Sequence, residues 1–209
     1  MKKQLLIVFV KNIKLGKVKT RLAKTIGNEA AFEVYKELVS LTENATNNLS
    51  FDKRIYFSDS VDQTKWQNDL KTIQYGIDLG ERMKNAFADG FNLGYENIIL
   101  IGSDLPDISN SIIENGFKAL QKSEVVFGPA EDGGYYLIGM SKLNSFIFED
   151  KPWSQSNLLD VTLNELNKNN IKFSLLDILN DIDTYEDLIA SNFYKNNTEL
   201  QQKIKQLNG

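Results

Sequence analysis

The sequence contains no histidine and no cysteine among its 209 residues. Without these residue types the chain cannot form a Ser-His-Asp or Cys-His relay, a thiolate nucleophile, a disulfide, an iron–sulfur cluster or a Cys/His zinc site. Any metal must be held by carboxylate, carbonyl or water oxygens, which favours Mg²⁺, Mn²⁺ or Ca²⁺. Any general base that the protein supplies must be Asp, Glu, Lys or Tyr.

An excess of basic charge is also missing. The formal net charge is −4, so the chain has no overall field that attracts nucleic acid, although a local basic patch could still bind phosphate. Residues 4–10 form the first apolar run, which is too short for a membrane span and lacks the features of a signal peptide. We expect a cytoplasmic protein with no membrane span and no nucleic-acid partner.

Strand and helix patterns alternate along the chain. Residues 5–10 and 97–102 are continuous apolar runs, typical of strands that are buried on both faces. The remaining patterns predict strands near 54–58, 72–75, 124–128, 135–140 and 172–176, and helices near 28–45, Trp66, 81–93, 109–120, 154–167, 184–191 and 200–207. This order predicts an α/β sandwich with a mostly parallel sheet, and the Gly133-Gly134 turn predicts one antiparallel interruption. We find no repeat or linker and expect a single domain over residues 1–209.

In such sheets ligands bind beyond the carboxyl ends of the strands, so residues just after the apolar runs are candidates. The loop after the first run carries several cations and a glycine, which suits a polyphosphate, although it lacks the order of a Walker A loop. Arg21, at the end of this loop, is one of only three arginines in the chain. A solvated surface loop is the alternative interpretation. The candidate residues here are Lys11, Gly16, Lys17, Lys19, Thr20 and Arg21.

Asp104 follows the second apolar run directly, in the segment Gly102-Ser103-Asp104-Leu105-Pro106. The strand fixes the position of this carboxylate, and Pro106 favours an extended conformation for the residue before it. A carboxylate held in this way is a good ligand for a hard divalent cation. The alternative is a helix cap, but Ser109 is better placed to cap the helix that follows.

Two further segments carry acids. Asp132-Gly133-Gly134 is typical of a hairpin turn, and the glycines would also let a ligand approach the backbone closely. Asp181-Ile182-Asp183 places both carboxylates on one side of an extended segment, which suits a cation bound to polyphosphate. The alternative for this segment is that Asp183 or Thr184 caps the next helix.

Two weaker candidates open helices. Gly80 and Arg82 lie where backbone N–H groups and a guanidinium could meet a ligand, and Trp153 could serve as a platform for a ring. Capping and packing explain these residues equally well.

Together these segments resemble the rSAM/selenodomain-associated transferase family of small bacterial glycosyltransferase-A-like proteins, in the nucleotide-diphospho-sugar transferase superfamily. The resemblance spans nearly the whole chain and implies a Rossmann-like GT-A sandwich with helices on both faces of the sheet. Two departures matter. The family's first loop has prolines where this chain has residues 12–15, so we expect a more mobile loop. At Asp104 the chain also has a single Asp, where sugar transferases commonly have Asp-x-Asp. The matching segments are Lys11, Gly16 to Leu22, Leu79 to Met83, Gly102 to Pro106, Gly128 to Gly139, Pro152 to Ser154 and Asp181 to Leu188.

The resemblance implies that the first loop holds nucleotide phosphates and that Asp104 stands where the superfamily binds its metal. Asp181 and Asp183 would complete a site for Mg²⁺ or Mn²⁺. The expected nucleotide-binding residues are Lys11, Gly16, Lys19, Thr20, Arg21, Gly80, Arg82, Ser103, Gly133 and Gly134, and the expected catalytic residues are Lys19, Arg21 and Asp132.

The leading hypothesis is a metal-dependent transferase that uses a nucleotide or nucleotide-sugar and a small-molecule acceptor, of the glycosyltransferase kind. The runner-up is a guanylyltransferase-like nucleotidyl transfer to a phosphorylated substrate, which needs no general base and therefore suits a chain without histidine. A nucleotide-binding protein without catalytic activity is the third hypothesis.

Overall fold

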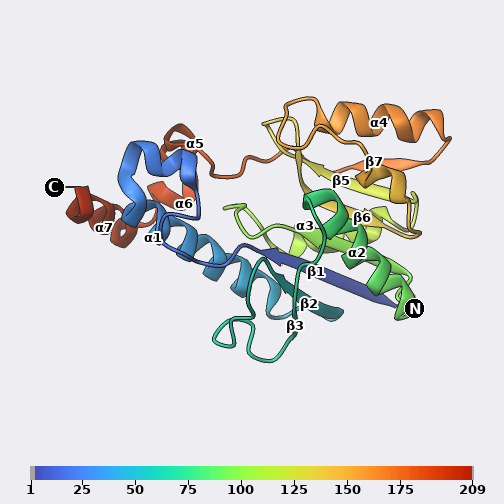
Figure 1. The fold of residues 1–209 in the computed structure, drawn as a ribbon, viewed down its shortest axis with the longest axis horizontal. Helices are drawn as coiled ribbons and strands as arrows, with labels where there is room; N and C mark the ends of the chain where they lie inside the picture. Colours follow the sequence, from blue (N-terminus) through green and yellow to red (C-terminus); the bar gives the residue numbers. More distant parts are fainter. Residues whose placement is uncertain (1–2, 209) are drawn as a thin grey trace.

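A computed structural model describes residues 3–208 and places helices on both faces of a central sheet (Figure 1). The strands in the described residues are β1 (Gln4–Val10), β2 (Asp52–Phe57), β3 (Leu70–Ile73), β4 (Asn97–Ile101), β5 (Val125–Pro129), β6 (Tyr135–Met140) and β7 (Phe173–Leu175). The helices there are α1 (Thr20–Thr46), α2 (Leu79–Asn92), α3 (Asn110–Ala119), the 3₁₀ helix η1 (Ser145–Phe148), α4 (Leu158–Lys168), α5 (Tyr185–Ala190), α6 (Asn192–Lys195) and α7 (Thr198–Asn208).

The seven strands in the described residues follow the order β3-β2-β1-β4-β6-β5-β7. β1 pairs in parallel with β2 and with β4, and β5 pairs in parallel with β7. β6 runs antiparallel to both of its neighbours. The expected mostly parallel sheet with one antiparallel interruption is therefore confirmed.

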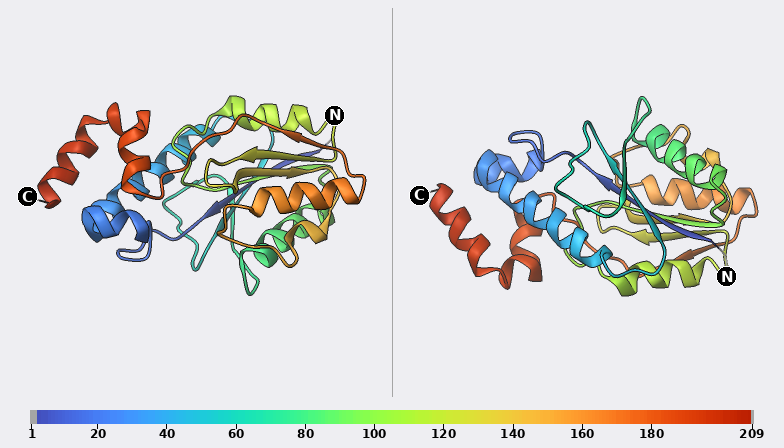
Figure 2. Two further views of the ribbon diagram at one scale, coloured as in Figure 1. Left: turned by 90° about the horizontal axis from the view of Figure 1, so that it is seen from above. Right: turned by 90° about the horizontal axis from the view of Figure 1, so that it is seen from below.

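Helices cover both faces of the sheet (Figure 2). Alternate residues of β1 face opposite layers, as the two-residue period of a strand requires. Leu6, Val8 and Val10 face the core beneath α1 and α3, whereas Leu5 and Ile7 face the core beneath α2 and α4. Because both faces are covered, every residue from Leu5 to Val10 is buried. This explains the continuous apolar run.

Helix α1 is interrupted at Gly27, which has φ 80° and ψ 161°. The predicted helix corresponds to the part after this break, and the part before it was not expected. Helices α5 and α7 pack against the first half of α1 through a third apolar cluster that includes Leu22, Ile26, Leu188 and Leu200. The C-terminal helices therefore lie beside the beginning of α1 (Figure 1).

Two other predictions of local structure need correction. The expected helix around Trp66 is absent from the described residues: this segment forms turns, and Trp66 has a positive φ of 43°. Its indole Nε1 instead donates to Thr46 Oγ1 at 2.9 Å, so tertiary contacts determine its conformation. Helix α4 begins at Leu158 rather than Ser154, which has φ 64°. The sequence analysis also missed η1 and α6.

No helix within residues 3–208 has the length and apolar character needed to cross a bilayer.

Candidate functional site

The carboxyl ends of the parallel strands meet at one edge of the sheet, where a cavity of about 470 Å³ opens. Segments from β1, β4, β5 and the stretch before α5 all reach this edge, as the doubly wound topology requires. Of the predicted site residues, the cavity is lined by Thr20, Arg21, Asp104, Asp132, Gly134, Asp181 and Asp183.

Lys19 lies behind Asp104 and pairs with it. Its Nζ lies 3.0 Å from Asp104 Oδ2, and the lysine side chain is only 6% exposed. The backbone of Lys19 is left-handed, with φ 46°, at the N-cap of α1, a conformation uncommon for a residue with a side chain. Burial alone lowers the pKa of Lys19, but Asp104 and Asp181 outweigh burial and raise that pKa above its ordinary value. Lys19 is therefore a charged ammonium inside the site.

Arg21 pairs with the other end of the chain. Its guanidinium lies 2.8 Å from Asp183 Oδ2. Thr184, rather than Asp183, caps α5 in a reciprocal capping box with Asp187, which resolves the alternative left open by the sequence. Likewise Ser109 caps α3 by accepting from Ile112 N, so Asp104 has no capping role there. Neither Asp104 nor Asp183 caps a helix, and each instead pairs with a cation of the site.

Asp181 is the carboxylate whose environment is most unfavourable to its charge. Burial, followed by the negative charge of Asp104, raises its pKa from 3.8 to about 6, while Lys19 opposes that rise. Asp132 also contributes to the rise, although it is exposed and its Oδ1 accepts from Gly134 N at 2.8 Å. The site therefore holds two cations, Lys19 and Arg21, and four carboxylates. When all are ionised, the site carries an excess of two negative charges. The carboxylates are Asp104, Asp132, Asp181 and Asp183.

Tyr35 is a site-organising residue that sequence reasoning missed, because on α1 it looked like an ordinary core position. Its hydroxyl accepts from Lys11 N at 3.0 Å and donates to Lys11 O at 3.1 Å. The same hydroxyl lies 2.9 Å from Ser103 Oγ, next to Asp104. Tyr35 thus joins the start of the first loop to the end of β4, and Ser103 serves this link from a buried position.

The other predicted nucleotide-binding residues lie apart from the described lining of the cavity. A Cβ on Gly80 would lie 2.5 Å from the Trp153 ring, and a Cβ on Gly133 would clash with Ser156 O. These glycines are required by close packing against protein atoms. Arg82 Nε donates to Gly76 O at 3.2 Å, and Gly16 takes a positive φ of 71° in the first loop. Lys11 contributes backbone contacts to Tyr35, and its side chain is exposed.

The opposite wall of the cavity is apolar and was not predicted, apart from the suggestion that Trp153 could act as a platform. It is built by side chains from β1, α2, β4, β6 and the segment that leads into α4. These are Phe9, Leu79, Met83, Leu100, Tyr135, Ile138, Trp153 and Leu158.

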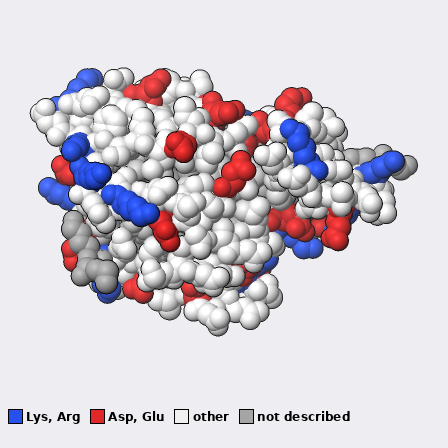
Figure 3. All heavy atoms as spheres, turned by 180° about the vertical axis from the view of Figure 1, so that it is seen from behind, with Lys and Arg blue, Asp and Glu red and all other residues white. Residues whose placement is uncertain are grey.

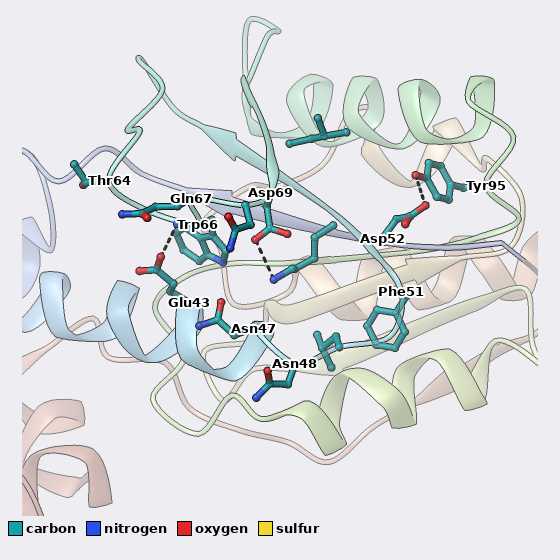
Figure 4. Close-up of a pocket in the computed structure, with 14 residues that line it drawn as sticks. Glu43, Asn47, Asn48, Phe51, Asp52, Thr64, Trp66, Gln67, Asp69 and Tyr95 are labelled. Carbon is teal, nitrogen blue, oxygen red and sulfur yellow. Dashed lines mark hydrogen bonds and ion pairs between the residues drawn. The ribbon is translucent and has the colours of Figure 1, made fainter.

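A larger cavity, of about 760 Å³, lies at the other end of the sheet, where β2 and β3 begin (Figure 4). Its charged groups already have partners: Lys53 Nζ lies 3.1 Å from Asp69, the Tyr95 hydroxyl donates to Asp52 at 2.7 Å, and Glu43 pairs with Lys65. Parallel strands place ligands at their carboxyl ends, so the smaller cavity is the candidate site despite its size.

Acidic and basic side chains are interspersed on the face of the molecule shown in Figure 3. This distribution agrees with the modest net charge of −4.

A scan against protein families matches residues 41–155, just over half of the chain, to a family described as an uncharacterized protein conserved in bacteria (DUF2064). The chain belongs to the DUF2064 family. No curated protein matches it significantly. Association with radical-SAM or selenodomain proteins stays a prediction.

Solved structures place this DUF2064 member in a known fold. It is similar to a Desulfovibrio desulfuricans G20 protein provisionally named a nucleotide-diphospho-sugar transferase, with 29% identity, a TM-score of 0.85 and 99% of each chain covered. A cytidylyltransferase from Leptospira borgpetersenii is 14% identical, with a TM-score of 0.57 over 100% of this chain and 97% of that one. Rv0371c from Mycobacterium tuberculosis H37Rv, solved in complex with manganese, is 11% identical, with a TM-score of 0.53 over 90% and 97%. The expected nucleotide-diphospho-sugar transferase fold is confirmed.

Proposed function

We propose that this protein is a divalent-metal-dependent transferase that acts on a nucleotide or nucleotide-sugar, with glycosyl transfer from a nucleotide-sugar as the leading reaction. The observation that carries the proposal is the convergence of Asp104, Asp181 and Asp183 with Lys19 and Arg21 at one edge of the sheet. The likeness to the Desulfovibrio protein over 99% of both chains supports a nucleotide-sugar as the donor.

The residues present suit a hard divalent cation in their chemistry. Asp181 is a buried carboxyl whose pKa burial raises to about 6, and its neighbours leave an excess of negative charge that a cation would offset. Among the described residues, no three acidic side chains form a ready-made cage for a metal, and Lys19 already pairs with Asp104. Binding would therefore require these side chains to rearrange.

Asp104, Asp181 and Asp183 would hold Mg²⁺ or Mn²⁺, and the ion would supply positive charge at the diphosphate. Lys19 and Arg21 would bind phosphate oxygens as cations and stabilise the negative charge that develops on the leaving diphosphate. Asp132 is exposed, lines the same cavity and would accept the proton of an acceptor hydroxyl.

Nucleotidyl transfer is the second candidate, and the fold similarity to cytidylyltransferases favours it. In that reaction an ionised phosphate attacks the α-phosphate of a nucleoside triphosphate, and pyrophosphate leaves. No residue has to remove a proton, which suits a site without histidine.

The experiment is a calorimetric titration of nucleoside triphosphates and nucleotide-sugars, with and without Mn²⁺, followed by product analysis with the tightest ligand. Release of nucleoside diphosphate in the presence of an acceptor indicates glycosyl transfer, and release of pyrophosphate indicates nucleotidyl transfer. Binding without turnover would instead support a nucleotide-binding protein.

The matched variants are Asp104→Asn and Asp107→Asn, because Asp107 is an exposed aspartate that does not belong to the described cavity lining. We expect Asp104→Asn to weaken Mn²⁺-dependent nucleotide binding by roughly tenfold or more, as loss of a charged ligand should. Asp107→Asn should bind like the wild type. Equal affinities for all three proteins would refute the site.

A further inference from the structure

The candidate cavity has two chemically different halves, and the proposed function uses only one of them. Arg21, Asp104, Asp181 and Asp183 line the charged half, which phosphates and a cation would occupy. The other half is a wall of apolar side chains, which carry no charge to bind a phosphate or a cation. It is formed by Phe9, Leu79, Met83, Leu100, Tyr135, Ile138, Trp153 and Leu158. We call this set the apolar wall.

The apolar wall is a fixed surface. Met83 and Leu100 belong to the buried core between the sheet and α2, so their positions are set by close packing. The Trp153 ring is held against α2, because Gly80 leaves no space there for even a methyl group. The Tyr135 ring packs on Phe127 with 5.2 Å between ring centroids. These contacts prevent the wall from collapsing into the cavity.

One polar group within this wall is unsatisfied. The Tyr135 hydroxyl is buried and has no hydrogen-bond partner among the described residues. A buried hydroxyl without a partner is costly, but protein atoms enclose this one, so a ligand in the cavity could bond to it only if the ring moved.

We propose that the apolar wall is the binding surface for the acceptor, and that the acceptor is amphipathic, with an apolar body against Trp153, Met83 and Leu79 and its reacting group at the charged half. This inference rests on the proposed function, because it assigns the donor phosphates to Lys19 and Arg21. Those cations lie at the start of α1, Lys19 as its N-cap and Arg21 in its first turn, whereas most of the wall comes from α2, β4, β6 and the approach to α4 (Figure 1).

A nucleobase is a weaker fit to the same wall. Specific recognition of a base needs several donors and acceptors around the ring edge. Beside the apolar side chains, the polar side chains that line the cavity next to Trp153 are those of Ser154 and Gln155. The wall therefore favours an apolar body over a base.

The test uses a homologous series of 1-alkanols, from butanol to octanol, as neutral probes of the wall. In a Trp66→Phe background, Trp153 is the sole tryptophan and reports binding by its fluorescence. Each added methylene should tighten binding by roughly fourfold while the chain still fits the wall. Equilibrium dialysis of octanol with the wild-type protein gives the same constants without any substitution.

Leu79→Asp and Leu93→Asp are matched variants, because the two leucines are 48% and 47% exposed and lie at opposite ends of α2. We expect Leu79→Asp to weaken octanol binding by roughly tenfold, since it places a charge on the wall. Leu93→Asp should not change it. A response that is independent of chain length, or equal in both variants, would overturn the proposal.

Two further arms separate this inference from the proposed function. Free nucleosides should not displace octanol; displacement would assign the wall to a base and overturn the acceptor assignment. Asp104→Asn should leave octanol binding intact while it weakens Mn²⁺-dependent nucleotide binding. If no nucleotide binds but the fourfold increments persist, the proposed function fails and the apolar subsite stands.

Discussion

The buried carboxyl of Asp181 makes the stability of this fold depend on pH in a direction that can be measured. Burial and the nearby Asp104 raise its pKa from 3.8 to about 6. Since one pKa unit corresponds to about 1.4 kcal/mol, ionised Asp181 costs the folded state at most about 3 kcal/mol. Part of the residue remains accessible to water, so we expect the measured cost to be about 1 to 2 kcal/mol.

The sign follows from comparing the folded and unfolded states. Below the ordinary pKa of 3.8 the carboxyl is protonated in both states and makes no difference. As pH rises from there to about 6, the unfolded chain ionises first, so the free energy of unfolding falls. Above about pH 7 both states are ionised and the loss is complete.

Asp181→Asn removes this titration, so the variant should gain stability relative to the wild type as pH rises. Urea unfolding with EDTA at about pH 4.5 and about pH 8 should show a relative gain of about 1 kcal/mol at the higher pH, because the unfolded carboxyl is already mostly ionised at pH 4.5. Asp107→Asn, at an exposed position outside the cavity lining, is the control and should show no such trend. A difference between Asp181→Asn and wild type that is the same at both pH values would refute the reasoning.

Two substitutions test other parts of the site. Lys19→Met removes the buried cation that pairs with Asp104. Because the Asp104 side chain is 42% exposed and water can partly replace its partner, we expect the free energy of unfolding in urea at neutral pH to fall by about 2 kcal/mol. An unchanged midpoint would contradict the buried ion pair. Gly133→Ala should lower stability by at least about 3 kcal/mol, because its Cβ would meet Ser156 O. Gly94 also has a positive φ, but no atom lies within 4 Å of the Cβ that alanine would add there. Gly94→Ala should therefore lower stability by only about 1 kcal/mol in the same assay. Equal losses in the two variants would show that the clash at Gly133 is relieved.

The parts of the fold that the sequence predicted are those where burial itself leaves a pattern. β1 and β4 are buried on both faces, so their residues form unbroken apolar runs. Asp104 could be singled out because it follows one of these runs. The turns around Trp66 could not be predicted, because their conformation depends on Glu43 and Thr46, which lie far away in sequence. The extent of the domain and the cytoplasmic location stay predictions.

The glycines show why the site was harder to predict than the fold. A glycine in a motif indicates that some atom comes close to the backbone, but not whether that atom belongs to a ligand. At Gly80 it belongs to Trp153 and Phe148, and at Gly133 to Ser156. Tyr35 presents the opposite difficulty, because its hydroxyl organises Lys11 and Ser103 while its spacing on α1 is that of a core residue.

The Asp-Ile-Asp segment explains how the far end of the chain is tied to the site. In an extended segment alternate side chains point to opposite sides, so Ile182 points away from its two neighbours. Ile182 is 1% exposed and packs in the cluster with Leu22 and Leu188. Its backbone N–H also donates to Asp104 O at 3.4 Å. The described residues of the C-terminal helices α5 and α7 do not line the cavity. With α1, however, these helices complete the apolar cluster that anchors Ile182. This anchor holds Asp181 and Asp183 beside Asp104, so the C-terminal helices help to position the acidic side of the cavity.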